Sequence, residues 1–261
     1  MSFENIKFKV ENRVAYITIN NPPANALNSP TIHELSECIG YIAESDEIKS
    51  VIITGAGKFF VAGADIKEFK VAFGDEQKGE EMAKAAQCLF DRIEQLKKPV
   101  IAAINGACLG GGLELAMSCH LRLAAHEALL GLPELKLGLI PGYGGTQRLA
   151  RITNKAKALE LILTSKPIKG EEAERIGLVN QSIPLEELIP TAKQLAESIA
   201  AEKSAVSIAA ALEAVSQGLE TSLEEGLKLE AKLFGELFGT EDMREGVLAF
   251  IDKRQSQFTD K

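Results

Sequence analysis

The amino-acid sequence predicts an α/β fold with buried strands. Short, almost wholly apolar runs such as SVIITGAG (residues 50–57) and PVIAAING (99–106) are typical of strands covered on both faces. Segments with helical apolar spacing alternate with these runs, which favours a largely parallel sheet. The strand signal ends near residue 184, and helical patterns rich in Ala, Leu, Glu and Lys follow.

The first predicted elements are a hairpin and a helix. Residues 6–20 alternate as two strands around a turn at Glu11-Asn12. A helix is predicted to begin near Pro30, with Asn28 or Ser29 as its N-cap residue. The elements predicted next are a strand at 50–57, a strand running into a short helix at 58–69, a helix at 78–97 and a strand at 99–106.

The second half of the chain becomes progressively helical. A helix is predicted from the stretch 105–119, a strand at 121–125, and a loop-rich region leading into a helix at 131–152. Four further helices are predicted at 185–202, 204–217, 221–237 and 241–254. We therefore expect a main domain over residues 1–190 and a helical C-terminal region over residues 191–261.

The composition and net charge of the chain argue against several classes of protein. The 261 residues are 46% hydrophobic and 25% charged, as in soluble globular proteins. A net charge of -8 without a basic run argues against a nucleic-acid or anionic-membrane surface. No window approaches the roughly 20 apolar residues of a membrane span, and the N-terminus lacks a secretory pattern. We expect a cytoplasmic protein.

The cysteines and histidines favour neither a metal site nor a disulfide framework. No two cysteines form a CxxC pair, and no two histidines stand at ligand spacing. His120 and His126, six residues apart, are interpreted as surface or loop residues. The four isolated cysteines are Cys38, Cys88, Cys108 and Cys119.

The stretch NGACLGGGLELAMSC (105–119) places three glycines at the start of a helix. It is not a nucleotide loop: Leu113 occupies the hydroxyl position of a Walker motif, and Leu115 the last glycine position of a Rossmann fingerprint. A glycine at a helix start can leave backbone N–H groups open to an oxyanion. The alternative is a tight strand-to-helix turn with close packing.

Two acidic residues stand in apolar surroundings. Glu114 lies among Leu and Ala residues in the predicted first helical turn, and Glu134 follows the nearly uncharged ALLGLP. Apolar surroundings raise the pKa of a carboxyl group, which suits proton transfer, so the two could form an acid/base pair. The alternatives are a residue favoured by the helix dipole and two unrelated surface acids.

KFFVAGADIKEF (58–69) offers a second oxyanion donor. Gly63 permits a tight turn, Ala64 leaves its N–H uncovered, and Asp65 begins a helix. The alternative for Ala64 is small-residue packing. Lys67 and Lys253 could meet phosphate groups or could simply be solvated side chains.

Four motifs together resemble the crotonase (enoyl-CoA hydratase/isomerase) family, and most of all its enoyl-CoA hydratases. They are FFVAGADIKEF, NGACLGGGLELAMSC, GLPELKLGLIPGYGGTQRL and REGVLAFIDKR, in the family's order. The resemblance implies a spiral of repeated ββα units in residues 1–190 and a helical trimerisation region in 191–261. It also implies an acyl-CoA thioester substrate, no cofactor, no metal, and a homotrimer or homohexamer.

The resemblance also implies roles for individual residues. The N–H groups of Ala64 and Gly111 would form the oxyanion hole. Glu114 would activate water for attack at C3, and Glu134 would deliver a proton to C2, giving a (3S)-3-hydroxyacyl-CoA. The remaining substrate-binding positions implied by the motifs are Ala62, Asp65, Ile66, Lys67, Gly142, Phe250 and Lys253.

Several alternatives remain open within this family. Isomerases that shift a double bond generally need only one of the two acids, so the presence of both favours a carbon–oxygen lyase. A branched-chain, methylglutaconyl-type hydratase and an RNA-binding relative are further possibilities, the latter opposed by the acidic charge. Acyl length and pathway stay open among fatty-acid β-oxidation, amino-acid breakdown and polyester precursor supply.

Overall fold

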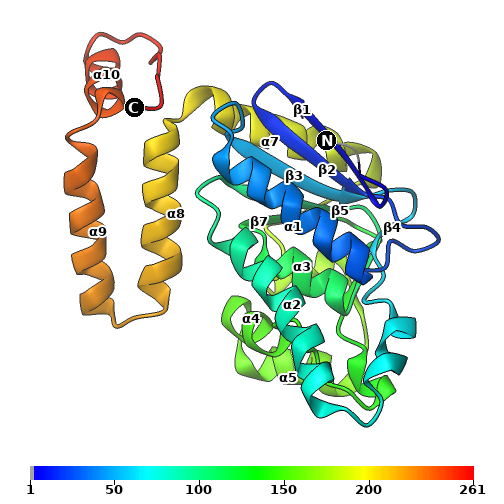
Figure 1. Cartoon of the computed structure of the whole chain (residues 1–261). Helices are drawn as coiled ribbons and strands as arrows, with labels where there is room; N and C mark the ends of the chain where they lie inside the picture. Colours follow the sequence, from blue (N-terminus) through cyan, green and yellow to red (C-terminus); the bar gives the residue numbers. More distant parts are fainter. Residues whose placement is uncertain (1–2) are drawn as a thin grey trace.

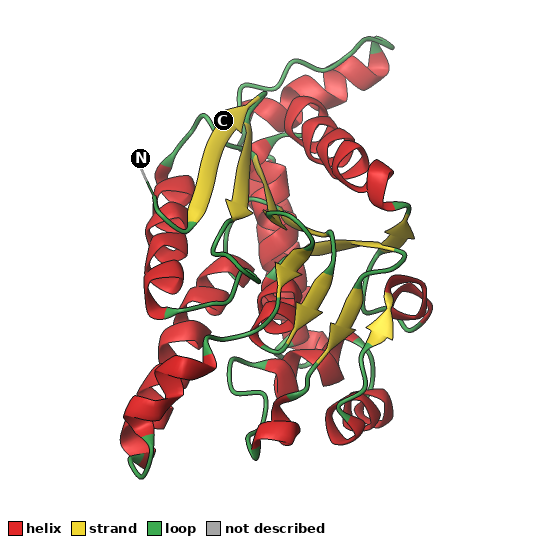
Figure 2. Ribbon diagram, turned by 90° about the vertical axis from the view of Figure 1, so that its right-hand side faces the viewer, coloured by secondary structure: helices red, strands yellow, loops and turns green. Residues whose placement is uncertain are grey.

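The computed structural model describes residues 3–261 and confirms the α/β architecture. Two sheets of unequal size form the body of the molecule, with helices around them (Figures 1 and 2). The large sheet has the order β1-β2-β3-β5-β7-β10, and the small sheet the order β4-β6-β8-β9. The strands are β1 (Ile6–Glu11), β2 (Val14–Ile19), β3 (Ser50–Gly55), β4 (Phe59–Val61), β5 (Val100–Ile104), β6 (Ala107–Leu109), β7 (Leu121–Ala125), β8 (Leu129–Gly131), β9 (Ile168–Lys169) and β10 (Gln181–Ile183).

From β3 to β8, successive strands of the chain belong alternately to the large and the small sheet. After the antiparallel hairpin β1–β2, each of β3, β5 and β7 enters the large sheet in parallel, and the strand that follows it enters the small sheet. Helical segments follow each pair and lead to the next, which is the repeated ββα arrangement implied by the resemblance. The helical segments of the body are α1 (Ser29–Glu44), η1 (Ile66–Ala72), α2 (Glu76–Glu94), α3 (Gly111–Ser118), η2 (Glu134–Leu137), α4 (Gly145–Ile152), α5 (Lys155–Thr164), α6 (Gly170–Arg175) and α7 (Leu185–Glu202).

The main core lies on the faces of the large sheet. Every residue of β5 is buried, as its uniformly apolar sequence predicts. Helix α7 contacts β3, β5 and β7, and it turns Leu188, Ala192, Ala196 and Ala200 inward at a spacing of four residues. The three alanines let α7 lie close to the sheet.

The last three helices form an arm that projects from this body (Figure 1). They are α8 (Ala205–Leu219), α9 (Leu223–Leu237) and α10 (Glu241–Ile251). Helices α8 and α9 pack against each other as a hairpin, and no residue of α8 is buried. The expected division after residue 190 falls inside α7, which packs on the sheet, whereas the projecting arm begins with α8.

His120 and His126 lie in loops, as interpreted from the sequence, but neither ring is fully exposed. His120 Nδ1 accepts a hydrogen bond from the Val100 N–H at 2.9 Å, and burial lowers the pKa of His120 to about 4. His126 Nδ1 lies 2.8 Å from the Ser182 hydroxyl. The predicted loop location is therefore confirmed for both, and the neutral ring of His120 accepts a hydrogen bond at the start of β5.

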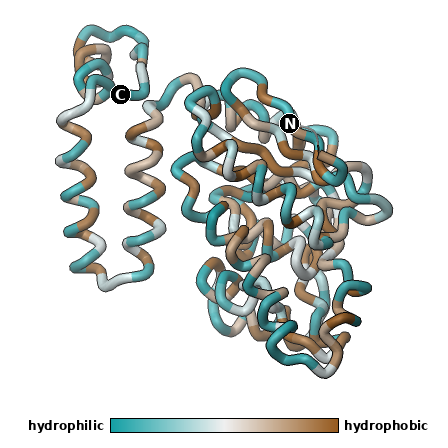
Figure 3. Tube along the Cα trace, in the orientation of Figure 1, coloured by the Kyte–Doolittle hydropathy of each residue, from teal (hydrophilic) through white to brown (hydrophobic). Residues whose placement is uncertain are grey.

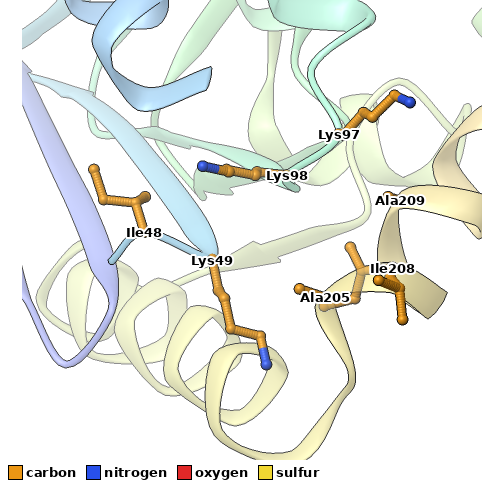
Figure 4. A pocket seen from close by; sticks show the side chains of 8 residues that line it. Ile48, Lys49, Lys97, Lys98, Ala205, Ile208 and Ala209 are labelled. Atoms are coloured by element: carbon orange, nitrogen blue, oxygen red, sulfur yellow. The ribbon is translucent and has the colours of Figure 1, made fainter. Parts of the chain in front are cut away.

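Asp260, near the C-terminus, forms hydrogen bonds and ion pairs that join the arm to the body. The Asp260 carboxylate accepts hydrogen bonds at 2.8 Å from the buried Lys49 ammonium and from the Ala205 N–H at the start of α8. Its second oxygen lies 2.7 Å from Arg13 Nη1. Figure 4 shows Lys49 beside a shallow notch between the body and α8, with its ammonium directed toward the end of α7, where it also donates to the Lys203 carbonyl.

We expect Asp260→Asn to lower the free energy of unfolding at neutral pH by about 1.5–3 kcal/mol, the usual contribution of hydrogen bonds to charged groups. Burial raises the pKa of Asp260, but the bonds from Lys49, the Ala205 N–H and Arg13 outweigh it and hold the pKa below its ordinary value. Because the folded-state pKa is lowered, this stabilisation is present above the ordinary pKa and is lost as pH falls.

Urea unfolding of the two proteins at neutral and at acid pH measures the effect. The control is Asp252→Asn, the same change at a carboxylate whose side chain is 59% exposed. An equal difference in stability at both pH values, or no difference at neutral pH, would contradict the expectation.

Candidate active site

The candidate site lies where three neighbouring parallel strands of the small sheet end. Ala64 follows β4, Gly111 follows β6, and Glu134 follows β8. The carboxyl ends of adjacent parallel strands meet at one edge of a sheet, which is where ligands of α/β proteins commonly bind. The sheet thus brings together three segments that lie far apart in the sequence.

The backbone N–H groups of Ala64 and Gly111 are available to a ligand at this edge. A Cβ atom added to Gly111 would lie 3.4 Å from the Ala64 nitrogen, so the two backbone segments are in contact. Hydrogen bonds between Leu27 and the residues on either side of Ala64 fix its backbone. Within residues 3–261, no protein atom accepts a hydrogen bond from either N–H. Gly111 also begins α3, where the helix dipole favours negative charge.

Glu114 is a buried carboxyl group in the first turn of α3. It is 1% exposed, and its Oε1 accepts hydrogen bonds from the Tyr143 N–H at 2.8 Å and the Gly145 N–H at 2.7 Å. Burial raises the pKa of Glu114 to about 7, and the charge of Glu134 adds to this rise. The two N–H groups and Arg148 act in the opposite direction. This carboxyl group can therefore both take and give a proton near neutrality.

Glu134 begins η2 and faces the same edge. Its Oε2 is buried and has no hydrogen-bond partner among the described residues, and burial raises the pKa of Glu134. A Cβ atom on Gly110 would lie 2.7 Å from Glu134 Oε1, and Gly110 has a φ of 52°. Glycine at this position therefore provides both the turn into α3 and the space for the second carboxyl group.

Five of the other predicted substrate-binding residues lie in the segments that form this edge. Ala62, Asp65, Ile66 and Lys67 surround Ala64 at the start of η1, where the Asp65 carboxylate accepts the Lys67 N–H at 3.0 Å. The side chain of Ile66 is 52% exposed. Gly142 lies in the turn at residues 141–145, next to the groups that hold Glu114, and its carbonyl accepts from Gln87.

The remaining two predicted residues are not part of this group within one chain. Phe250 lies on α10 and Lys253 lies just after it, in the projecting arm and away from α3 (Figure 1). Phe250 is 85% exposed. The structure therefore places both residues away from the edge that carries the two glutamates.

Sequence reasoning missed the turn that holds Glu114. Tyr143 packs its ring against Gly111 and makes an edge-to-face contact with Phe90, with centroids 6.2 Å apart. The Gly145 N–H and the Arg148 side chain complete this neighbourhood. The letters PGYGG do indicate a turn, but no local pattern reveals that its N–H groups meet a carboxylate some 30 positions earlier in the chain.

Residues 3–261 contain no group of three or more His, Cys, Asp or Glu side chains arranged to hold a metal ion. Over the same residues, no helix is long and apolar enough to cross a membrane.

Comparisons with known proteins agree on one family. The sequence profile of the family described as enoyl-CoA hydratase/isomerase matches residues 9–261. The chain is 52% identical over 254 residues to a probable enoyl-CoA hydratase of Bacillus subtilis, covering 97% of this chain and 98% of that protein. It is 44% identical to a short-chain-enoyl-CoA hydratase of Clostridium acetobutylicum, covering 98% and 97%. The crystal structure of an enoyl-CoA hydratase from Bacillus anthracis has a TM-score of 0.94 at 38% identity, covering 99% of this chain and all of that one.

We expect Glu134→Gln to lower the pKa of Glu114 below its value of about 7, because the negative charge of Glu134 helps to raise it. A carbon-13 NMR titration of the Glu114 carboxyl group, assigned with Glu114→Gln, measures the shift. Glu127→Gln is the matched control, since Glu127 is exposed and pairs with Lys169. An unchanged pKa in Glu134→Gln would show that the two carboxyl groups do not interact.

Proposed function

Because the chain belongs to the enoyl-CoA hydratase/isomerase family, we propose that it adds water to a trans-2-enoyl-CoA and forms a (3S)-3-hydroxyacyl-CoA. The observation that carries the proposal is the meeting of two carboxyl groups and two available N–H groups at the ends of β4, β6 and β8. The family membership inferred from the four motifs is confirmed by the profile match over residues 9–261.

The two N–H groups would bind the thioester oxygen. Attack of water at C3 of a conjugated thioester moves negative charge onto the carbonyl oxygen, giving an enolate-like transition state. Donors already in place at Ala64 and Gly111 stabilise this oxygen more in the transition state than in the substrate. Each such donor typically contributes about 10²–10³ in rate.

The two glutamates would move the protons. The Glu114 carboxylate takes a proton from water as the water oxygen bonds to C3, and a protonated Glu134 gives its proton to C2. The sum is addition of H and OH across the double bond. Before the next cycle Glu114 must lose the proton it has taken and Glu134 must regain one, by transfer between them or with solvent. The raised pKa values of both groups support such roles near neutral pH, because each carboxyl group can exist in either form.

No electrons leave or enter the substrate in this reaction, so it needs no redox cofactor. The Ala64 and Gly111 N–H groups would supply the carbonyl polarisation that a metal ion could otherwise give, so we propose that it needs no metal either. Coenzyme A enters as part of the substrate. The side chains of Ile66, Leu139 and Ile140 near the candidate site are exposed and apolar, which suits an acyl chain. The likeness to the short-chain enzyme of Clostridium acetobutylicum supports short acyl chains as the substrates to test first.

The alternatives are less well supported. A double-bond isomerase generally needs one acid, whereas Glu114 and Glu134 both lie at this edge. An RNA-binding role would require a basic surface, and the net charge is -8. A branched-chain hydratase would use the same groups and is distinguished by its substrate alone. We also propose a cytoplasmic location, which the acidic, soluble-type composition supports.

We further propose that the arm joins copies of this chain into a homotrimer or a pair of trimers. Exposed apolar residues recur along α9 at the spacing of one helical face, and α8 adds others. Figure 3 shows hydrophobic and hydrophilic residues interspersed along both helices. Phe250 and Lys253 could then serve the substrate site of a neighbouring copy, since they lie away from their own. The large exposed apolar residues of α8, of α9 and of the C-cap position of α9 are Val215, Leu219, Leu223, Leu227, Phe234 and Phe238.

We expect Glu114→Gln and Glu134→Gln each to lower kcat for hydration by about 10²–10⁴, the usual contribution of a general acid or base. Loss of enoyl-thioester absorbance, followed on substrates of increasing acyl length from crotonyl-CoA upward, measures the rates. Glu171→Gln, at an exposed carboxylate on α6, is the control and should behave as wild type. Wild-type inactivity at every length, or full activity of Glu114→Gln, would rule out the proposal.

For the assembly, we expect the double variant Phe234→Glu/Phe238→Glu to sediment as a monomer while the wild type sediments as a trimer or hexamer. Lys232→Glu is the control, since Lys232 lies on the opposite face of α9 and is 71% exposed. A wild type that sediments as a monomer, or a double variant that keeps the wild-type mass, would contradict the proposed interface.

A further inference from the structure

Arg148 on α4 is held by two carboxylates of α2. Its Nη2 lies 2.6 Å from Asp91 Oδ1 and 2.8 Å from Glu94 Oε2, and its Nε lies 3.1 Å from the same Glu94 oxygen. The Arg148 side chain is only 11% exposed. Several charge-assisted bonds to a planar guanidinium fix its orientation as well as its position.

The same guanidinium also meets the turn at residues 141–145. Arg148 Nη1 donates to the Tyr143 carbonyl at 3.3 Å. A Cβ atom on Gly144 would lie 2.2 Å from this nitrogen, and Gly144 has a φ of 112°. The backbone of the turn therefore lies directly against the guanidinium. A side chain at position 144 would prevent this conformation.

The other side of this turn holds the candidate base. The Tyr143 N–H and the Gly145 N–H both donate to Glu114 Oε1, so the peptide units between them connect Arg148 to Glu114. We propose that Arg148 is a positioning residue that fixes this turn so that both N–H groups meet the Glu114 carboxylate. Its kinetic consequence rests on the proposed hydratase function, but the geometric claim does not.

Arg148 also contributes to the electrostatic surroundings of Glu114. Its positive charge favours the carboxylate form, and the charge of Glu134 opposes it. Tyr143 and Cys108 stay neutral, because burial raises the pKa of each. The charged side chains that act on Glu114 are Glu134 of η2 and Arg148 of α4, and Arg148 is itself paired with Asp91 and Glu94 of α2.

Removal of the guanidinium has two expected effects. The turn loses its support, so the two N–H groups no longer both reach Glu114. The site also loses a positive charge while Asp91 and Glu94 keep their negative charges. Both changes disfavour the carboxylate form of Glu114 and raise its pKa.

The experiment compares Arg148→Gln and Arg148→Lys with wild type by steady-state kinetics across pH and by NMR titration of the Glu114 carboxyl group. We expect Arg148→Gln to lower kcat by about 10–100-fold with little change in KM, as for a small misplacement of a reacting group. The acidic limb of its pH profile and the pKa of Glu114 should both move to higher pH. Arg148→Lys keeps the charge but not the forked contacts, so kcat should fall with a smaller shift in pKa.

The matched control is Arg151→Gln, one turn further along α4. Arg151 is 58% exposed and bonds to Gln147 rather than to the turn, so this variant should match wild type in every readout. Should Arg148→Gln fail to fold, Arg148→Lys alone carries the test through its loss of kcat.

The outcomes separate the two proposals. Unchanged kcat, pH profile and Glu114 pKa in both Arg148 variants would overturn the positioning role, even if the wild type hydrates enoyl-CoA. A raised Glu114 pKa in Arg148→Gln, with a wild type inactive on all enoyl-CoA substrates, would support the positioning role and reject the hydratase proposal.

Discussion

The hydrogen bonds from the Tyr143 and Gly145 N–H groups to the buried Glu114 carboxylate are the contacts on which the site depends. An ionised carboxyl group removed from water without partners is strongly destabilised, and its pKa rises until it is neutral. Two backbone donors counter this effect, so the pKa of Glu114 is about 7 despite its burial. The turn at 141–145 therefore determines whether the group can act as a base.

The spacing along α3 links this carboxylate to the oxyanion donor. Gly111 and Glu114 are three residues apart on one helix, so they lie on the same side of its first turn. The same helix start therefore offers an N–H to a thioester oxygen and a carboxyl group to the water that attacks the acyl chain. Alternation of the chain between the two sheets then adds Ala64 and Glu134 from neighbouring strands.

Local patterns were sufficient for much of the fold and for the central residues. The apolar runs of β3 and β5 identified the buried strands, and the unusual placement of glutamates among apolar residues singled out Glu114 and Glu134. The second strand of the first repeat, β4, was predicted within 58–69, but β6 and β8 were missed, because three residues are too few for a periodic pattern. The predicted helix over 105–119 therefore contains β6 before α3 begins.

Features that depend on distant contacts could not be read from the sequence. The hydrogen bonds of Glu114 join residues about 30 positions apart, and the Asp260 contact to Lys49 joins residues 211 positions apart. Phe250 and Lys253 matched a motif, but motif matching does not say which copy of the chain they serve. The buried residues Leu188, Ala192, Ala196 and Ala200 pack α7 on the sheet, a contact that the pattern used to place the division after residue 190 does not reveal.

The most direct test of the central claim is a crystal structure of the protein with an unreactive acyl-CoA thioester bound. The thioester oxygen should lie about 2.7–3.1 Å from both the Ala64 and the Gly111 nitrogen, the range expected for an oxyanion hole. C2 and C3 should then face Glu134 and Glu114. A thioester oxygen bonded to neither nitrogen, or an acyl chain whose C3 lies out of reach of both carboxyl groups, would contradict the claim.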